Sequence, residues 1–180
     1  VPFYVRQARR AGKPAIRYWG DKYPHYDEIL HLLPRLFPGA RFVLIHRDLR
    51  DTIASAMQQF QWTAPQAAPF VCAIYDRYVR LAEQMVREGV VPGEHFLHVN
   101  YHDANTRVLE EAGRLFAALG LLFPEATAAR VQELAGIQAH SIRRSDRAPR
   151  PFEIAASHQR WARDLSEADL AVVLRAITEI

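Results

Sequence analysis

The sequence predicts an α/β fold with a largely parallel sheet. Residues 40–46 and 95–101 are short apolar runs rich in β-branched and aromatic residues, as is typical of strands. Each run is followed by a segment with the apolar spacing of a helix, and strands that alternate with helices indicate parallel pairing. Ligands of such sheets bind beyond the carboxyl ends of the strands, where this chain carries the charged run RDLRD at 47–51.

The first elements follow from local patterns. Residues 15–22 form a candidate short strand that leads into a loop. Residues 26–37 have helical apolar spacing, but Pro34 predicts a kink or an end within that helix. The run at 40–46 shows no polar alternation, so we expect a strand covered on both faces.

Helices account for most of the remaining chain. Asp48 or Asp51 is expected to cap the first of them, and Ser166 with Asp169 resembles a capping box for the last. The basic, proline-broken segment 140–153 is predicted to be a loop. The predicted helices are 50–60, 69–89, 105–120, 124–136 and 166–180.

Composition narrows the class of protein. With 180 residues, 49% hydrophobic and 24% charged, the chain is expected to be a single soluble domain over 1–180 without a membrane span. A net charge of +3 suits an anionic ligand but not a surface that coats nucleic acid. Cys72 is the only cysteine, so no disulfide can form within the chain, and we expect a reducing, cytoplasmic location.

Arg47 and Ser55 are the leading binding candidates from spacing. Arg47 stands where the strand ends, and Ser55 falls in the first turns of the next helix. The N-terminus of a helix attracts anions, an arginine fork binds phosphate, and a serine hydroxyl can complete the shell. The alternative interpretation is that Arg47 and Arg50 only pair with the neighbouring aspartates as helix-start electrostatics.

The segment LFPGARFVLIHRDLRDTIAS favours the binding interpretation. It resembles the phosphate-binding segment of sulfotransferases that use 3'-phosphoadenosine-5'-phosphosulfate (PAPS). The resemblance implies a P-loop-NTPase-like parallel sheet with flanking helices. It also implies that Arg47 and Ser55 bind the 3'-phosphate of the nucleotide, and that PAPS donates a sulfuryl group to an acceptor hydroxyl or amine.

Further segments resemble the same family in the same order. WGDKYP at 19–24 implies that Lys22 lies near the transferred sulfuryl group as a catalytic residue. The tail IRRSDRAPRPFEIAASHQRW resembles that of tyrosylprotein and related bacterial sulfotransferases. It implies a catalytic Ser145, which donates a hydrogen bond to the bridging region, and a cofactor-binding Arg150. The family implies no metal. Its acceptors imply a small-molecule or peptide partner.

Three departures from the family pattern affect the expectation. The lysine of the family's basic-proline pair is Arg150 here, and an arginine does not readily give up a proton. The Y-E-D block of the family reads Tyr101-His102-Asp103 here, so one acid is replaced. A loop of the type P-R-S-G-T-T, which cradles the 5'-phosphosulfate, is absent. We therefore expect a C-terminal portion of the fold, incomplete at the N-terminus and inactive as this fragment. Strands 40–46 and 95–101 would then leave an open slot between them or pair directly.

Other interpretations remain open at this stage. A P-loop kinase-like enzyme would need a Walker lysine, which the chain lacks, and a non-catalytic remnant would bind only a nucleotide or a partner. His25 is interpreted as a surface histidine. A metal site at His95, His98 and His102 is rejected, because on a strand only the last two share a face and no acid or cysteine joins them at ligand spacing.

Overall fold

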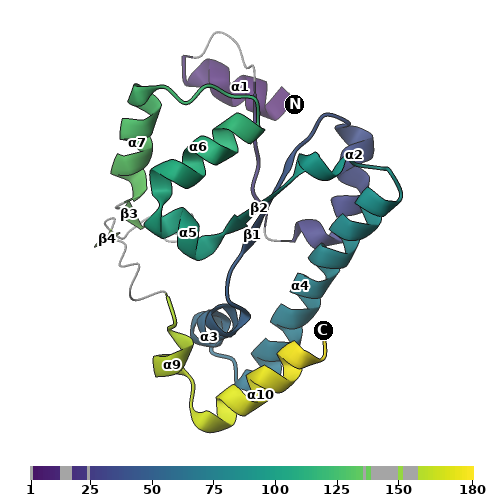
Figure 1. The fold of residues 1–180 in the computed structure, drawn as a ribbon, viewed down its shortest axis with the longest axis vertical. Coiled ribbons are helices and arrows are strands. Elements are labelled where there is room, and N and C mark those ends of the chain that lie inside the picture. The colour runs from purple at the N-terminus through teal and green to yellow at the C-terminus, as the bar shows by residue number, and fades with distance from the viewer. Residues whose placement is uncertain (1, 13–17, 24, 136, 139–149, 152–157) are drawn as a thin grey trace.

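Two parallel strands lie at the centre of the structure, with helices around them (Figure 1). The structure is a computed structural model of the 180-residue chain, and it describes all residues except 1, 13–17, 24, 136, 139–149 and 152–157. β1 (Phe42–His46) pairs with β2 (Phe96–Asn100), so that Phe42 lies opposite Phe96 and His46 opposite Asn100. The predicted α/β class is confirmed, with a small parallel sheet of two strands.

β1 and β2 pair directly, which is one of the two expected arrangements. Leu97 of β2 is 8% exposed, whereas Val43 and Ile45 of β1 are 44% and 64% exposed. The prediction that this strand is covered on both faces is therefore wrong for β1. Side chains alternate along a strand, so Phe42 and Leu44 pack against the apolar cluster beside α4 while the opposite face of β1 is open to solvent.

Helices form most of the described chain. The long ones are α3 (Leu49–Phe60), α4 (Ala64–Arg87), α6 (Val108–Ala118), α7 (Glu125–Ala135) and α10 (Glu167–Thr178). The shorter helical elements are α1 (Pro2–Arg10), η1 (Tyr26–Glu28), η2 (Leu30–Leu32), α2 (Leu33–Leu36), η3 (Gly93–His95), α5 (Tyr101–Thr106) and α9 (Trp161–Asp164).

The segment before β1 is broken into short helical turns, as Pro34 predicts. η1, η2 and α2 follow one another, and Pro34 occupies the first turn of α2, where its missing N–H costs no intrahelical bond. The candidate strand at 15–22 is not observed in its described part, because residues 18–22 have no regular structure.

α4 begins five residues before the predicted start at Pro69. The N–H of Thr63 donates to Oε1 of Gln66 at 2.9 Å, which caps the helix, and Pro65 lies in the first turn. Pro69 is tolerated inside the helix near this end. Gly89 follows the helix with φ +67°, in the left-handed region that suits a glycine stop.

The region predicted as one helix over 105–120 consists of α5 and α6. Asn100 ends β2, and its side chain accepts hydrogen bonds from the N–H groups of His102 and Asp103, so the chain turns into α5 at Tyr101. A non-helical residue, Arg107, with φ −122° and ψ 47°, then separates α5 from α6.

The C-terminal region confirms one capping prediction and corrects the loop prediction. Ser166 accepts from the N–H of Asp169 at 3.1 Å, and the Asp169 carboxylate accepts in return from Ser166, as in a capping box. Within the predicted loop, β4 (Arg150–Pro151) pairs antiparallel with β3 (Ile137–Gln138). Backbone pairing overrides the turn-forming composition there, and the rest of 140–153 lies outside the described residues.

Two apolar clusters hold these elements together. The first joins α3, α4 and α10, and its small side chains let these helices approach closely (Figure 1). The second lies between β1, β2 and α4. The first cluster therefore holds α3 and the second holds β1, the two elements on either side of Arg47. The buried members are Ile53, Ala56, Ala64, Ala67, Ala68, Cys72 and Val173 in the first, and Leu30, Ala82, Met85, Val91 and Phe96 in the second.

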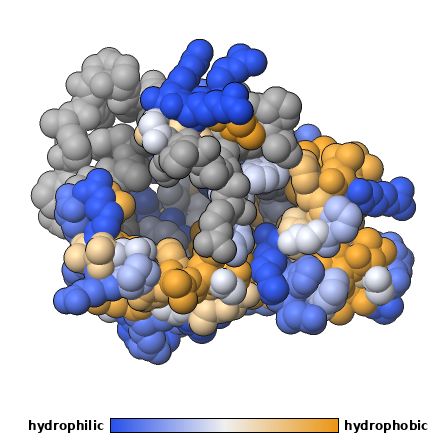
Figure 2. Space-filling model, turned by 90° about the horizontal axis from the view of Figure 1, so that it is seen from above, coloured by the Kyte–Doolittle hydropathy of each residue, from blue (hydrophilic) through white to orange (hydrophobic). Residues whose placement is uncertain are grey.

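Some apolar side chains remain at the surface. Figure 2 shows hydrophobic residues on the right of the face seen from above, which is the side of α2 and the end of α4 in Figure 1. The exposed large residues of these elements and the turns beside them are Leu32, Leu36, Val86 and Val90. Among the helices that the structure describes, none is both long and apolar enough to span a bilayer.

Candidate functional site

A pocket opens where β1 and β2 end. Its volume is about 340 Å³, and its walls come from the start of α3, the start of α5 and the residue His158 ahead of α9. Parallel strands bring their carboxyl ends to one edge, which is why segments separated by about 50 residues in the sequence meet here. The lining residues are Arg47, Asp48, Asp51, Asn100, Tyr101, His102, Asp103, Asn105 and His158.

Arg47 lines this pocket and directly follows β1. Its side chain is half-buried, and its guanidinium carbon lies 4.9 Å from the centre of the Tyr101 ring. Such a cation–π contact orients the guanidinium without removing its charge. The predicted position of Arg47 at the strand end, beside a helix start, agrees with the structure.

Asp48 is the N-cap of α3 and is paired with Arg50. Oδ1 of Asp48 accepts from the backbone N–H of Arg50 at 2.9 Å, and Oδ2 lies 2.6 Å from Nη2 of that residue. The side-chain hydrogen bonds from Arg50 lower the pKa of Asp48, although partial burial opposes this effect. The helix-start interpretation is therefore confirmed for Arg50.

Asp51 connects α3 to the start of α9 (Trp161–Asp164). Its side chain is buried, with 2% exposure, and its carboxylate accepts the backbone N–H of Gln159 at 3.0 Å and that of Trp161 at 3.1 Å. The Arg50 guanidinium lies over the Trp161 ring at 4.2 Å. These contacts hold α9 against α3 and place His158 at the pocket.

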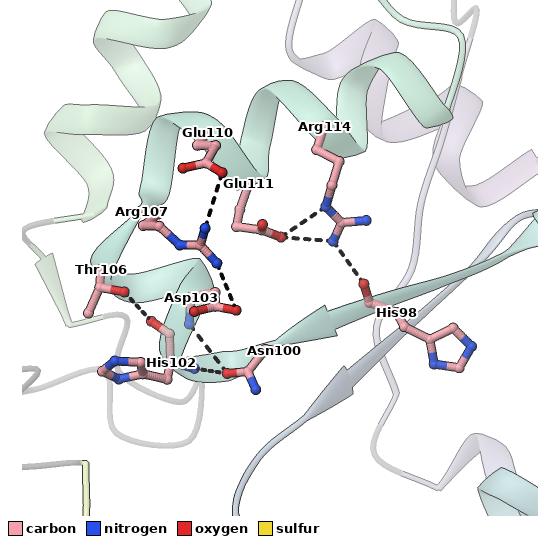
Figure 3. A network of polar contacts seen from close by, with 9 residues as sticks. All are labelled: His98, Asn100, His102, Asp103, Thr106, Arg107, Glu110, Glu111 and Arg114. Carbon is pink, nitrogen blue, oxygen red and sulfur yellow. Dashed lines mark hydrogen bonds and ion pairs between the residues drawn. The ribbon is translucent and has the colours of Figure 1, made fainter.

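The α5 side of the pocket carries its own ion pairs (Figure 3). Arg107 bridges Asp103, at 3.0 Å, and Glu110, at 3.2 Å. Arg114 contacts Glu111 at 2.8 Å and also donates to the backbone carbonyl of His98, which ties α6 to β2. In Figure 3 the His102 ring points away from this network, and only its backbone takes part in it.

Ser55 is half-buried on α3, one turn beyond Asp51, and it is not among the residues that line the pocket. Helical periodicity puts Asp51 and Ser55 on the same side of α3. The structure thus brings Ser55 to the neighbourhood of the pocket but not to its wall, and its convergence with Arg47 on one anion stays a prediction.

Of the remaining predicted residues, Lys22 is not among the described residues that line the pocket. Lys22 is exposed in the irregular segment before η1. Ser145 lies outside the described residues. Arg150 belongs to β4, where its backbone pairs with Gln138, and its side chain lies outside the described part. Their roles stay predictions.

The histidines pair in a way that the sequence did not indicate. Nε2 of His46 lies 2.7 Å from Nδ1 of His98, with the rings stacked at 5.0 Å, and the Tyr75 hydroxyl is 3.5 Å from the other nitrogen of His46. Burial and the nearby charge of His98 lower the pKa of His46. His98 and His102 do not share a strand face, because β2 ends at Asn100.

Sequence reasoning noted His102 as the replacement for an acid of the resembled block and rejected it as a metal ligand, and it did not single out His158. Their rings meet with centroids 4.1 Å apart. The sequence signal for His102 was its position, because it replaces an acid of the Y-E-D block. No sequence signal marked His158. The residue after it, Gln159, is held by Asp51, which lies 108 residues earlier in the chain. In the described part of the chain no three or more His, Cys, Asp or Glu side chains are placed to hold a metal ion.

Comparison with known proteins identifies the family. A family model described as "Sulfotransferase family" matches residues 2–125, which contain both strands of the parallel sheet, α3, α5 and Arg47. No curated protein and no solved structure matches the chain significantly. The match covers more than half of the 180 residues. The chain belongs to the sulfotransferase family.

Proposed function

We propose that this chain binds the 3'-phosphate of PAPS at Arg47 and serves sulfuryl transfer from that donor. The observation that carries the proposal is the position of Arg47, at the end of β1, beside the N-terminus of α3, in an open pocket. An arginine fork and a helix N-terminus are both suited to a phosphate dianion.

The neighbouring charges support this assignment. Among the acids that line the pocket, Asp48 is paired with Arg50, and Asp103 is paired with Arg107. Two carboxylates that would otherwise repel a phosphate are thus partly neutralised by their own arginines. The contact with Tyr101 keeps the Arg47 guanidinium at the pocket wall.

Sulfuryl transfer breaks the bond between the sulfur and the bridging phosphate oxygen and forms one to an acceptor oxygen or nitrogen. The acceptor loses a proton, and the leaving phosphate gains negative charge that must be stabilised. In this proposal Lys22 supplies a compact positive charge near the sulfuryl group, and Ser145 donates a hydrogen bond to the bridging region. Ser55 and Arg150 join Arg47 on the nucleotide, and the acceptor is a small molecule or a peptide.

Calorimetric titration with adenosine 3',5'-bisphosphate tests the proposal. Arg47→Ala removes a charge-assisted contact and should weaken binding by about 1.5–3 kcal/mol, which is about 10- to 150-fold in Kd. Arg41→Ala is the matched control, because Arg41 is an exposed arginine directly before the same strand. Equal affinities of Arg47→Ala and the wild-type chain, with both folded by circular dichroism, would remove the assignment.

A second variant examines Ser55. If its hydroxyl contacts the same phosphate, Ser55→Ala should weaken binding by about 0.5–1.5 kcal/mol. An effect of Arg47→Ala without any effect of Ser55→Ala would keep the anion site and remove Ser55 from it.

A further inference from the structure

Two histidines meet at the pocket next to Arg47. His102 lies in the first turn of α5 and His158 precedes α9, and their ring centroids are 4.1 Å apart with 31° between the ring planes. Both residues line the pocket. Nδ1 of His102 is buried and has no hydrogen-bond partner among the described residues. A buried polar atom without a partner is costly, so a ligand that engages this imidazole would be favoured.

The acidic groups that face this pair are committed to other donors. On α3, Asp48 is paired with Arg50, and the Asp51 carboxylate accepts two backbone N–H bonds. On α5, Asp103 is paired with Arg107. The neighbouring carboxylates are already bound to other donors. A proton on either imidazole would therefore add positive charge to the pocket that these carboxylates neutralise only in part.

The cationic neighbours complete the surroundings. Arg47 comes from the end of β1 and lies over Tyr101, and an arginine keeps its charge at every working pH. Arg160, close to His158 in the sequence, is bonded to Asp164 and to the side chain of Gln58. Histidine, in contrast, changes its charge between pH 5 and 8.

We propose that His102 and His158 act with Arg47 as a pH-dependent anion-binding group for a phosphate monoester. The inference rests on the proposed function, since it assigns further residues to the same phosphate. A protonated imidazole donates from both ring nitrogens, and two stacked cations repel unless an anion lies beside them. Phosphate binding and proton uptake by the pair therefore favour each other, so affinity should be higher at acidic than at alkaline pH.

The test compares the wild-type chain with His102→Gln/His158→Gln, by calorimetry with adenosine 3',5'-bisphosphate at pH 6.0 and pH 8.0. The phosphate groups of the ligand also titrate. The quantity compared at each pH is therefore the dissociation constant of the variant divided by that of the wild-type chain. The wild-type chain should bind about tenfold more tightly than the variant at pH 6.0 and less than about threefold more tightly at pH 8.0. His25→Gln/His31→Gln is the matched control, because neither residue lines the pocket.

Two results overturn the inference. A ratio that is equal at both pH values would exclude a role for imidazole charge, and it would leave the proposed function intact as long as Arg47→Ala still weakens binding. Wild-type chain that binds no bisphosphate at either pH would refute both proposals. His158→Arg provides a test that does not depend on loss of a side chain: a fixed positive charge there should raise affinity above wild type at pH 8.0, and unchanged affinity would again overturn the inference.

Discussion

Replacing Asp51 with alanine removes the contact that holds α9 against α3. The carboxylate is 2% exposed and accepts two backbone hydrogen bonds, at 3.0 Å from Gln159 and 3.1 Å from Trp161. Hydrogen bonds to a charged group contribute about 1.5–3 kcal/mol each, so the pair sets an upper limit of about 3–6 kcal/mol. The freed N–H groups can reach water once α9 moves away, so we expect a loss of about 2–4 kcal/mol.

The free energy of unfolding, measured by urea titration with circular dichroism, checks this value. Asp51→Asn keeps one acceptor oxygen and should cost less, about 1–2 kcal/mol. Glu110→Ala is the control, because its ion pair with Arg107 is exposed and should contribute less than about 1 kcal/mol. Amide hydrogen exchange should also speed up at Gln159 and Trp161. If Asp51→Ala unfolds within about 0.5 kcal/mol of the wild-type chain, the buried carboxylate does not anchor α9 as argued.

Two further predictions concern the His46 pair and the last helix. Burial and His98 lower the pKa of His46 below its ordinary 6.5 in the folded chain, so the unfolded chain binds more protons under acidic conditions. Stability should be full above about pH 6.5 and fall as the pH drops toward the lowered pKa, and His46→Gln should flatten this slope in urea titrations at pH 5 and pH 7.5. A slope identical to that of the wild-type chain would contradict the assignment. Ser166→Ala removes the cap of α10 and should lower the free energy of unfolding by about 1 kcal/mol, whereas Ser166→Asn should be nearly neutral; equal losses in both would rule out capping as the cause.

Patterns in the sequence were enough to predict the parts of this protein that depend on neighbours along the chain. The run at 40–46 followed by RDLRD predicted a strand, a helix and an arginine between them, because apolar runs and caps act over a few residues. Ser166 and Asp169 predicted the start of α10 for the same reason. The same segment, 41–60, also carried the resemblance to sulfotransferases, and the family match includes it.

The contacts between side chains far apart in the sequence could not be predicted and are seen in the folded chain alone. The bond from Asp51 to Gln159 spans 108 residues, and the contact between His46 and His98 spans 52. Neither periodicity nor capping patterns predict such pairs. They depend on the register of β1 with β2 and on the packing of α9 against α3. The exposure of Ile45 has the same origin: the strand pattern describes the residues of β1, but burial of each face depends on which elements pack over it.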